Sequence, residues 1–139
     1  MAAVTVTFEV PGSPVPKGRP RTATRDRNGN LLAKPRVYTP TKTTDYEQLV
    51  AWCARAANLK LEPGKRYLLD IKLHLSSRHS RSDLDNFCKA ISDGLNQAGE
   101  PTGWDDRQIR DLRVLEVPVR SAAEEKAVVT IGEMSASIA

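Results

Sequence analysis

Two aspartates placed two residues apart, Asp83 and Asp85, are the residues of this sequence best suited to chemistry. They stand in the stretch RSDLDNFCK, which continues with Asn86 and Lys89. Two converging carboxylates repel each other, which raises the pKa of one of them unless a hard cation binds between them. Mg²⁺ accepts one or two protein carboxylates and takes its remaining oxygens from water and phosphate. The pair therefore predicts a magnesium site that acts on a phosphate-bearing substrate.

The same stretch opens an amphipathic helix. Apolar residues recur at helical spacing from Leu84 to Ala98, and Gly99 then supplies a residue that tolerates a positive φ at the helix end. Residues i and i+2 diverge on a helix but share a face in an extended chain. Asp83 and Asp85 can therefore hold one cation only if the helix begins after Asp83. We predict a strand-to-helix junction there, with Leu84 pointing into the core.

A purely structural role competes with the metal site. Ser82 to Asp85 matches the capping-box pattern of a helix N-terminus, and Asp85 with Lys89 would form a favourable i,i+4 ion pair. In this alternative the aspartates stabilise the helix and bind no metal.

A metal site built on this pair calls for a third acidic group, and Trp104-Asp105-Asp106 is the nearest candidate. Helix residues 85–98 span about 21 Å, and the seven steps from Gly99 to Asp106 span at most about 23 Å. Asp106 can return to the helix start only if the chain runs almost straight back along the helix. Otherwise a partner subunit must supply it.

The run RSDLDNFCKAISDGLNQAG, followed by WDDRQI and DLRVLEV, resembles the RusA family of Holliday junction resolvases, which are small metal-dependent DNA endonucleases. The resemblance implies that Asp83, Asp85 and Asp106 are the metal ligands. It also implies that Lys89 is a catalytic cation near the scissile phosphate, with Asn86 supporting the ligands. The implied cofactor is Mg²⁺, with Mn²⁺ as a possible substitute.

The resemblance covers about Leu73 to Met134, with a weaker match in PVPKGRPR near the N-terminus. Residues 100–103 lengthen the segment before the two later acids relative to the family pattern, so Asp105 and Asp106 both stay candidates for the third ligand. The resemblance further implies a homodimer that makes paired nicks in a four-way DNA junction. One or two metal ions are compatible with this chemistry.

Positive charge is concentrated near the N-terminus. The 139-residue chain has a net charge of +4, yet residues 11–36 hold seven Lys or Arg and one Asp, a net charge of +6. This stretch is too rich in Pro, Gly and charge to be core, and we interpret it as an arm that contacts DNA phosphates. A solvated loop is the alternative. The predicted DNA-binding cations are Lys17, Arg19, Arg21, Arg25 and Arg27 in the arm, and Arg78 and Arg81 beside the acidic motif.

The remaining pattern predicts a single α+β domain over residues 1–139, in which two helices cover one face of a small mixed sheet. The expected element order is β-α-β-α-β-β. A second capping box at Thr44 predicts a helix that runs to about Asn58. The expected strands are 4–10, 69–75, 112–117 and 126–131, with the last two paired as a hairpin.

Other features narrow the function. Cys53 and Cys88 fall on apolar helix stripes, as is typical of buried free thiols in a reducing compartment. We expect His74 and His79 to be surface or cap residues and not metal ligands. No apolar run is long enough to span a membrane, so we expect a cytoplasmic protein.

The sequence therefore predicts a Mg²⁺-dependent endonuclease that resolves branched DNA in recombination and repair. Two alternatives stay open. A non-catalytic basic DNA-binding module would use its aspartates as helix caps, and a protein-interaction domain would have no measurable DNA affinity at physiological salt.

Overall fold

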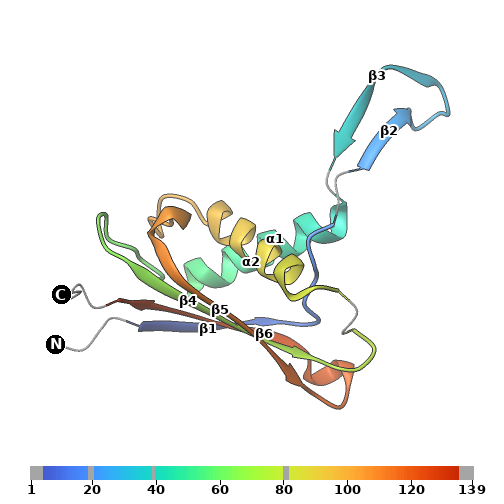
Figure 1. The fold of residues 1–139 in the computed structure, drawn as a ribbon. Helices are drawn as coiled ribbons and strands as arrows, with labels where there is room; N and C mark the ends of the chain where they lie inside the picture. Colours follow the sequence, from blue (N-terminus) through green and yellow to red (C-terminus); the bar gives the residue numbers. More distant parts are fainter. Residues whose placement is uncertain (1–4, 19–20, 39, 80–81, 135–139) are drawn as a thin grey trace.

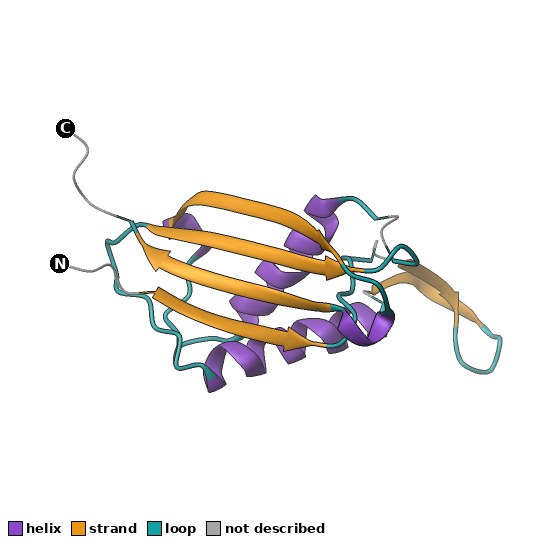
Figure 2. Ribbon diagram, turned by 90° about the horizontal axis from the view of Figure 1, so that it is seen from below, coloured by secondary structure: helices purple, strands orange, loops and turns teal. Residues whose placement is uncertain are grey.

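The computed structural model describes residues 5–18, 21–38, 40–79 and 82–134, which form a four-stranded sheet, two α-helices and a separate two-stranded hairpin (Figure 1). Both helices cover the same face of the sheet (Figure 2), so the predicted α+β class is confirmed. The elements are β1 (Thr5–Pro11), β2 (Arg21–Arg25), β3 (Leu31–Tyr38), α1 (Thr41–Ala56), β4 (Tyr67–Leu75), α2 (Leu84–Gln97), β5 (Ile109–Pro118) and β6 (Lys126–Glu133). The short 3-10 helices η1 (Asp106–Gln108) and η2 (Ala122–Glu124) precede β5 and β6.

The sheet is mixed, as predicted, with strand order β1-β6-β4-β5. β4 pairs antiparallel with β6 on one side and parallel with β5 on the other. The predicted hairpin of the last two strands is therefore wrong. The segment between them crosses the end of β4, where the N–H of Val119 binds the carbonyl of Leu75. Because β4 is buried, its backbone groups need partners along both edges, and the last two strands take opposite sides of it.

β4 forms the centre of the core. Its five alternate residues from Tyr67 to Leu75 are each no more than 4% exposed. Alternation along a strand places these side chains on one face, and they share the core with the apolar stripe of α2. Apart from Leu84, that stripe is the one predicted from the sequence, and Phe87, Ile91 and Leu95 are its most deeply buried members on α2; Ala90, outside the predicted stripe, is buried as well.

The two helices approach closely at Gly94 of α2. A Cβ atom placed on Gly94 would lie 2.6 Å from the Cβ atom of Val50 on α1, so only glycine fits there without a shift. α2 ends at Gln97, and Gly99 has a φ of 74°, which confirms the predicted helix end.

α1 begins three residues before the predicted capping box. Its N-cap is Pro40, whose carbonyl accepts the N–H groups of Thr43 and Thr44. The Thr44 hydroxyl donates to the carbonyl of Thr41 instead of capping the helix. The predicted N-cap at Thr44 is therefore wrong, because a proline with a fixed φ already starts the helix upstream.

Within the basic arm, β2 and β3 form a hairpin that adds two strands to the predicted element order. It projects away from the sheet and helices (Figure 1). Its turn is closed by Asp26, whose side chain accepts the N–H groups of Asn28 and Asn30. Gly29 has a φ of 83°, which places the predicted Asn28-Gly29 turn at the tip of this hairpin.

Within the described part of the chain, no helix is both long and apolar enough to cross a membrane. Cys53 and Cys88 are both free and buried, as predicted, and burial raises the pKa of each thiol.

Candidate active site

Asp83 and Asp85 lie where the chain enters α2. Asp83 is the N-cap residue, with an extended backbone (φ −65°, ψ 143°), and the helix begins at Leu84 as predicted. Both aspartates are exposed. Leu84 is also 37% exposed, so the prediction that it points into the core is wrong. Burial on α2 starts only at Phe87, and the first turn of the helix therefore lies at the surface.

Neither aspartate caps the helix with its side chain. The Asp83 side chain makes no capping hydrogen bond. Among the described residues, neither the Asp83 nor the Asp85 carboxylate has a hydrogen-bond or ion-pair partner, and the predicted Asp85–Lys89 ion pair is not formed. Two carboxylates without partners at a helix N-terminus are available to a cation.

Lys89 and Asn86 share the solvent-facing side of α2 with Asp85. All three are exposed, and spacings of three and four residues place them on one side of the helix. The carbonyl of Asn86 also accepts the N–H of Lys17 at 2.9 Å, which fastens the start of the basic arm to the first turn of α2. The arm and the acidic pair are therefore held together locally.

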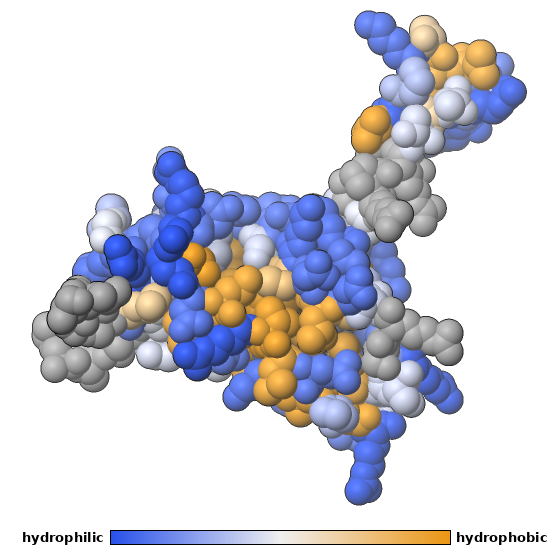
Figure 3. All heavy atoms as spheres, viewed as in Figure 1, coloured by the Kyte–Doolittle hydropathy of each residue, from blue (hydrophilic) through white to orange (hydrophobic). Residues whose placement is uncertain are grey.

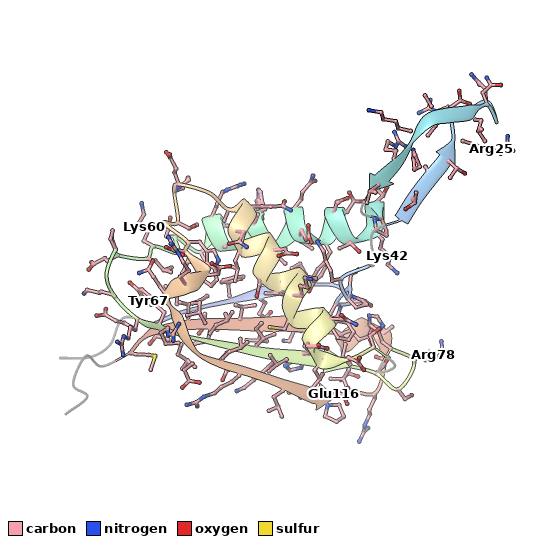
Figure 4. All side chains as sticks on the ribbon, turned by 45° about the horizontal axis from the view of Figure 1, so that its top comes forward. Arg25, Lys42, Lys60, Tyr67, Arg78 and Glu116 are labelled. Carbon is pink, nitrogen blue, oxygen red and sulfur yellow. The ribbon has the colours of Figure 1, made fainter. Side chains whose placement is uncertain are left out.

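Asp106 lies at the opposite end of the sheet from Asp83. It begins η1, and Ile109 beyond it stands opposite Tyr67 at the start of β4. Asp83 follows the far end of β4, and a strand of this length spans about 26 Å. The labelled Tyr67 and Arg78 mark these two ends in Figure 4. Across the described residues, no group of three acidic, histidine or cysteine side chains could hold a metal ion.

The segment after α2 turns toward β4 instead of running straight back along the helix. Two successive turns, closed by hydrogen bonds to the carbonyls of Gly99 and Glu100, redirect the chain. The N–H of Leu61 then binds the carbonyl of Thr102 at 2.7 Å. Because the segment does not run straight back along α2, Asp106 does not reach Asp83 and Asp85 of its own chain. The alternative that remains is an Asp106 supplied by a partner subunit.

Asp105 and Asp106 have different surroundings. Asp105 accepts hydrogen bonds from the backbone N–H and the guanidinium of Arg107, and these bonds lower the pKa of its carboxyl group. Asp106 is exposed, and its carboxylate has no hydrogen-bond or ion-pair partner among the described residues. Asp106 is therefore the aspartate of this pair whose carboxylate is available to a ligand.

Lys17 is committed to ion pairs inside the protein. Its Nζ lies 2.6 Å from the buried carboxylate of Glu47 and 2.9 Å from that of Asp93. Burial acts to lower the pKa of Lys17, but the two carboxylates outweigh this effect and hold the pKa above its usual value. Lys17 therefore has a structural role, because a buried carboxylate requires a cation beside it, and its phosphate contact stays a prediction.

Cations of two other regions face solvent. Arg78 is exposed beyond the end of β4, where it lines a cavity of about 240 Å³ together with Arg120, Ser77 and Ser121. The β2–β3 hairpin carries a larger open groove of about 580 Å³. Its basic lining residues are Arg25, Arg27, Lys34 and Arg36. Arg19 and Arg81 lie outside the described residues, as does the side chain of Arg21.

Arg120 cannot be picked out from the sequence, because a single arginine before a polar turn belongs to no recognisable motif. Lys34 and Arg36 contribute to the charge of the arm, but only the pairing of β2 with β3 shows that they line the same groove as Arg25 and Arg27.

A buried carboxylate fastens the loop that leads to Asp83. Glu125 is 5% exposed and accepts hydrogen bonds from the hydroxyl of Ser13 and from the backbone and hydroxyl of Ser76. Further along this loop, the His79 ring contacts the carbonyl of Pro14 and meets Phe87 edge to face. His79 therefore has a structural role in this loop.

We expect the Glu125→Gln variant to lack the part of the folding stability that the native protein loses as the pH is lowered. Burial acts to raise the pKa of Glu125, but the hydrogen bonds from Ser13 and Ser76 outweigh it and hold the pKa below its usual value. Because the folded pKa is lower than the unfolded one, the stabilisation is present above about pH 4.3 and is lost as pH falls through the folded pKa. Urea unfolding at a series of pH values measures this effect.

The native protein should lose free energy of unfolding on acidification more steeply than Glu125→Gln, which should be about 1–3 kcal/mol less stable at pH 7. Parallel curves for the two proteins across this pH range would show that Glu125 does not contribute through its charge.

Comparison with known families gives one match. Residues 11–132 match the model of a family described as Endodeoxyribonuclease RusA. The matched range includes the basic arm, the acidic pair at the start of α2 and the Asp-Asp pair before β5. No curated protein sequence matches the chain.

Proposed function

Because the chain belongs to the RusA endodeoxyribonuclease family, we propose that it resolves four-way DNA junctions by metal-dependent paired nicking, in recombination and repair. The observation that carries this proposal is the pair of exposed carboxylates of Asp83 and Asp85. Among the described residues, neither carboxylate accepts a hydrogen bond, forms an ion pair or caps the helix, so neither has a structural role in its contacts. A capping role, the basis of the non-catalytic alternative, therefore has no support from their contacts.

The donor set suits a hard divalent cation. Mg²⁺ prefers carboxylate oxygens and keeps several waters, and Asp83 and Asp85 offer such oxygens on the solvent side of the α2 N-terminus. Mn²⁺ suits the same ligands. When bound, such an ion would supply activation of water and stabilisation of the charge that develops on the phosphate.

We further propose that the third carboxylate is Asp106 of the partner subunit in a homodimer. Asp106 and Asp83 lie at opposite ends of the β4–β5 pair, so a two-fold axis near the middle of β5 would bring each Asp106 to the other subunit's Asp83. β5 is an edge strand, and its Leu112 and Leu115 are 55% and 57% exposed. Apolar side chains on an open edge are suited to contact with a second copy.

The remaining residues would position the DNA. Lys89 shares the exposed side of α2 with Asp85, and we assign it the role of a cation that stabilises charge on the scissile phosphate. Asn86, on the same side, would orient the acidic ligands. Arg78 at the end of β4 and the basic groove of the hairpin supply phosphate contacts on either side.

Cleavage of a labelled four-way junction, beside a linear duplex of matched sequence, tests the proposal. We expect paired nicks in the junction with Mg²⁺, no cleavage in EDTA, and no cleavage by Asp83→Asn. The control variant is Asp45→Asn, which removes an exposed carboxylate of α1 and should cut normally. If the native protein binds the junction but does not cut it in the presence of any divalent ion, it is instead a non-catalytic DNA-binding module.

A further inference from the structure

The β2–β3 hairpin has two chemically different faces. One face is the groove of about 580 Å³ described above, in which four basic side chains and Asp26 give a net charge of +3. On β3, the residues that line this groove are Leu32, Lys34 and Arg36. This face has the charge and the concave shape that suit a phosphate backbone.

On β3 the opposite face carries no charged side chain; on β2, Arg25 stands opposite Leu31 in the strand pairing, but its side chain lines the groove. Side chains alternate along a strand, so the β3 residues between those of the groove point the other way. They are Leu31, Ala33, Pro35 and Val37. Leu31 is 72% exposed and Val37 is 68% exposed, the largest values among the large apolar side chains of the described residues. Their exposure contributes nothing to folding, because apolar stabilisation requires removal from water.

The body of the protein leaves this face open. The hairpin stands apart from the sheet and helices in Figure 1, and Figure 3 shows apolar side chains at its surface with hydrophilic ones around them. A projecting strand pair with one basic and one apolar face is suited to a ligand that offers phosphates and apolar surface side by side. Nucleic acid with unstacked bases has both.

We propose that the apolar face of the hairpin, centred on Leu31 and Val37, contacts unstacked bases at the branch point of a DNA junction while the basic groove holds the phosphates of one arm. This assignment rests on the proposed function, since it takes branched DNA as the ligand. A linear duplex keeps its bases stacked and offers the apolar face little, whereas bases at a branch point can be unstacked by apolar side chains. The hairpin therefore confers preference for branched over linear DNA.

The test separates the two faces by substitution. Leu31→Thr with Val37→Thr removes the apolar surface but keeps residues that favour strands. Arg27→Ser with Lys34→Ser is the matched control on the groove face. Affinities of the full-length proteins for a four-way junction and for a linear duplex are measured in EDTA at several salt concentrations. Junctions carrying 2-aminopurine at the branch point report unstacking through their fluorescence.

We expect the apolar pair of substitutions to lower junction affinity about tenfold, leave duplex affinity unchanged, and reduce the 2-aminopurine signal. The groove pair should lower both affinities by a similar factor and reduce the salt slope by about two. The assignment is overturned if the apolar pair preserves junction preference or lowers both affinities equally. It is also overturned if sedimentation shows that this pair dissociates a dimer, because the face would then bind a second copy.

Failure of this assignment can be distinguished from failure of the proposed nuclease activity. A native protein that selects junctions through Leu31 and Val37 but never cuts them would retain this assignment and lose the enzymatic one. If the native protein cuts junctions and the variant with Leu31→Thr and Val37→Thr keeps full junction selectivity, the nuclease proposal stands and this assignment fails.

Discussion

Mixed dimers of Asp83→Asn and Asp106→Asn are expected to cut four-way junctions, although each variant alone is inactive. If Asp106 acts in the partner's site, one site of the mixed dimer carries both substitutions and the other carries neither. Random association should give about a quarter of the native number of intact sites. A mixed dimer holds one such site, so it should nick one strand of the junction without making the paired cut. Gel analysis of junctions labelled on each strand measures this directly.

The matched control is a mixture of Asp83→Asn with Asp85→Asn. Both substitutions fall in the same half of the proposed site, so every mixed dimer has two damaged sites and should stay inactive. Subunits carrying different affinity tags allow the mixed dimers to be isolated before the assay. If isolated Asp83→Asn/Asp106→Asn dimers never cut, the third ligand does not come from a partner subunit.

The acidic motif and its helix could be predicted because local rules determine them. The apolar stripe from Phe87 to Leu95, the start of α2 after Asp83 and the helix end at Gly99 all follow from neighbouring residues. These features depend on side-chain spacing and on backbone preferences within one helix. Leu84 fits the same stripe, yet whether the first turn overlies the core depends on where the sheet ends. That information lies elsewhere in the chain.

The position of Asp106 could not be predicted, because the length of the segment after Gly99 limits how far it extends but does not determine the direction in which it runs. Chain length allowed a return to Asp83, but the turns after Gly99 and the bond between Leu61 and Thr102 direct the chain to the start of β4. Parallel pairing of β5 with β4 then sets Asp106 at the far end of the sheet. Strand order likewise depends on contacts distant in sequence, so adjacent strands were wrongly expected to pair.

The basic arm was recognised by its charge but not by its structure. β2 and β3 pack against no core, and the charged residues and Pro35 that they carry are typical of loops and not of half-buried strands. Composition also could not separate Lys17 from the other cations. Its ion pairs with Glu47 and Asp93 exist because two helices, distant in sequence, meet beside it.

Asp106→Asn and Asp105→Asn should differ sharply, although the two residues are neighbours. Removing a metal ligand costs several kcal/mol of transition-state stabilisation, so we expect Asp106→Asn to cut at least about a hundredfold more slowly. The Asp105 carboxylate is occupied by Arg107 in a largely exposed ion pair. Because such pairs contribute little, Asp105→Asn should cut within about fivefold of the native rate. Single-turnover cleavage with saturating protein measures both rates.

Junction affinity in EDTA is the control for this comparison, and both variants should bind as the native protein does, since neither aspartate is assigned to DNA binding. Equal losses of cleavage would mean that Arg107 and Asp105 act in the site together with Asp106. A larger loss in Asp105→Asn would transfer the ligand role to Asp105, which would require Arg107 to release its carboxylate when the metal binds. The unpartnered carboxylate of Asp106 favours the larger loss in Asp106→Asn, because a ligand that must first give up two guanidinium hydrogen bonds, as Asp105 must, binds its cation less tightly.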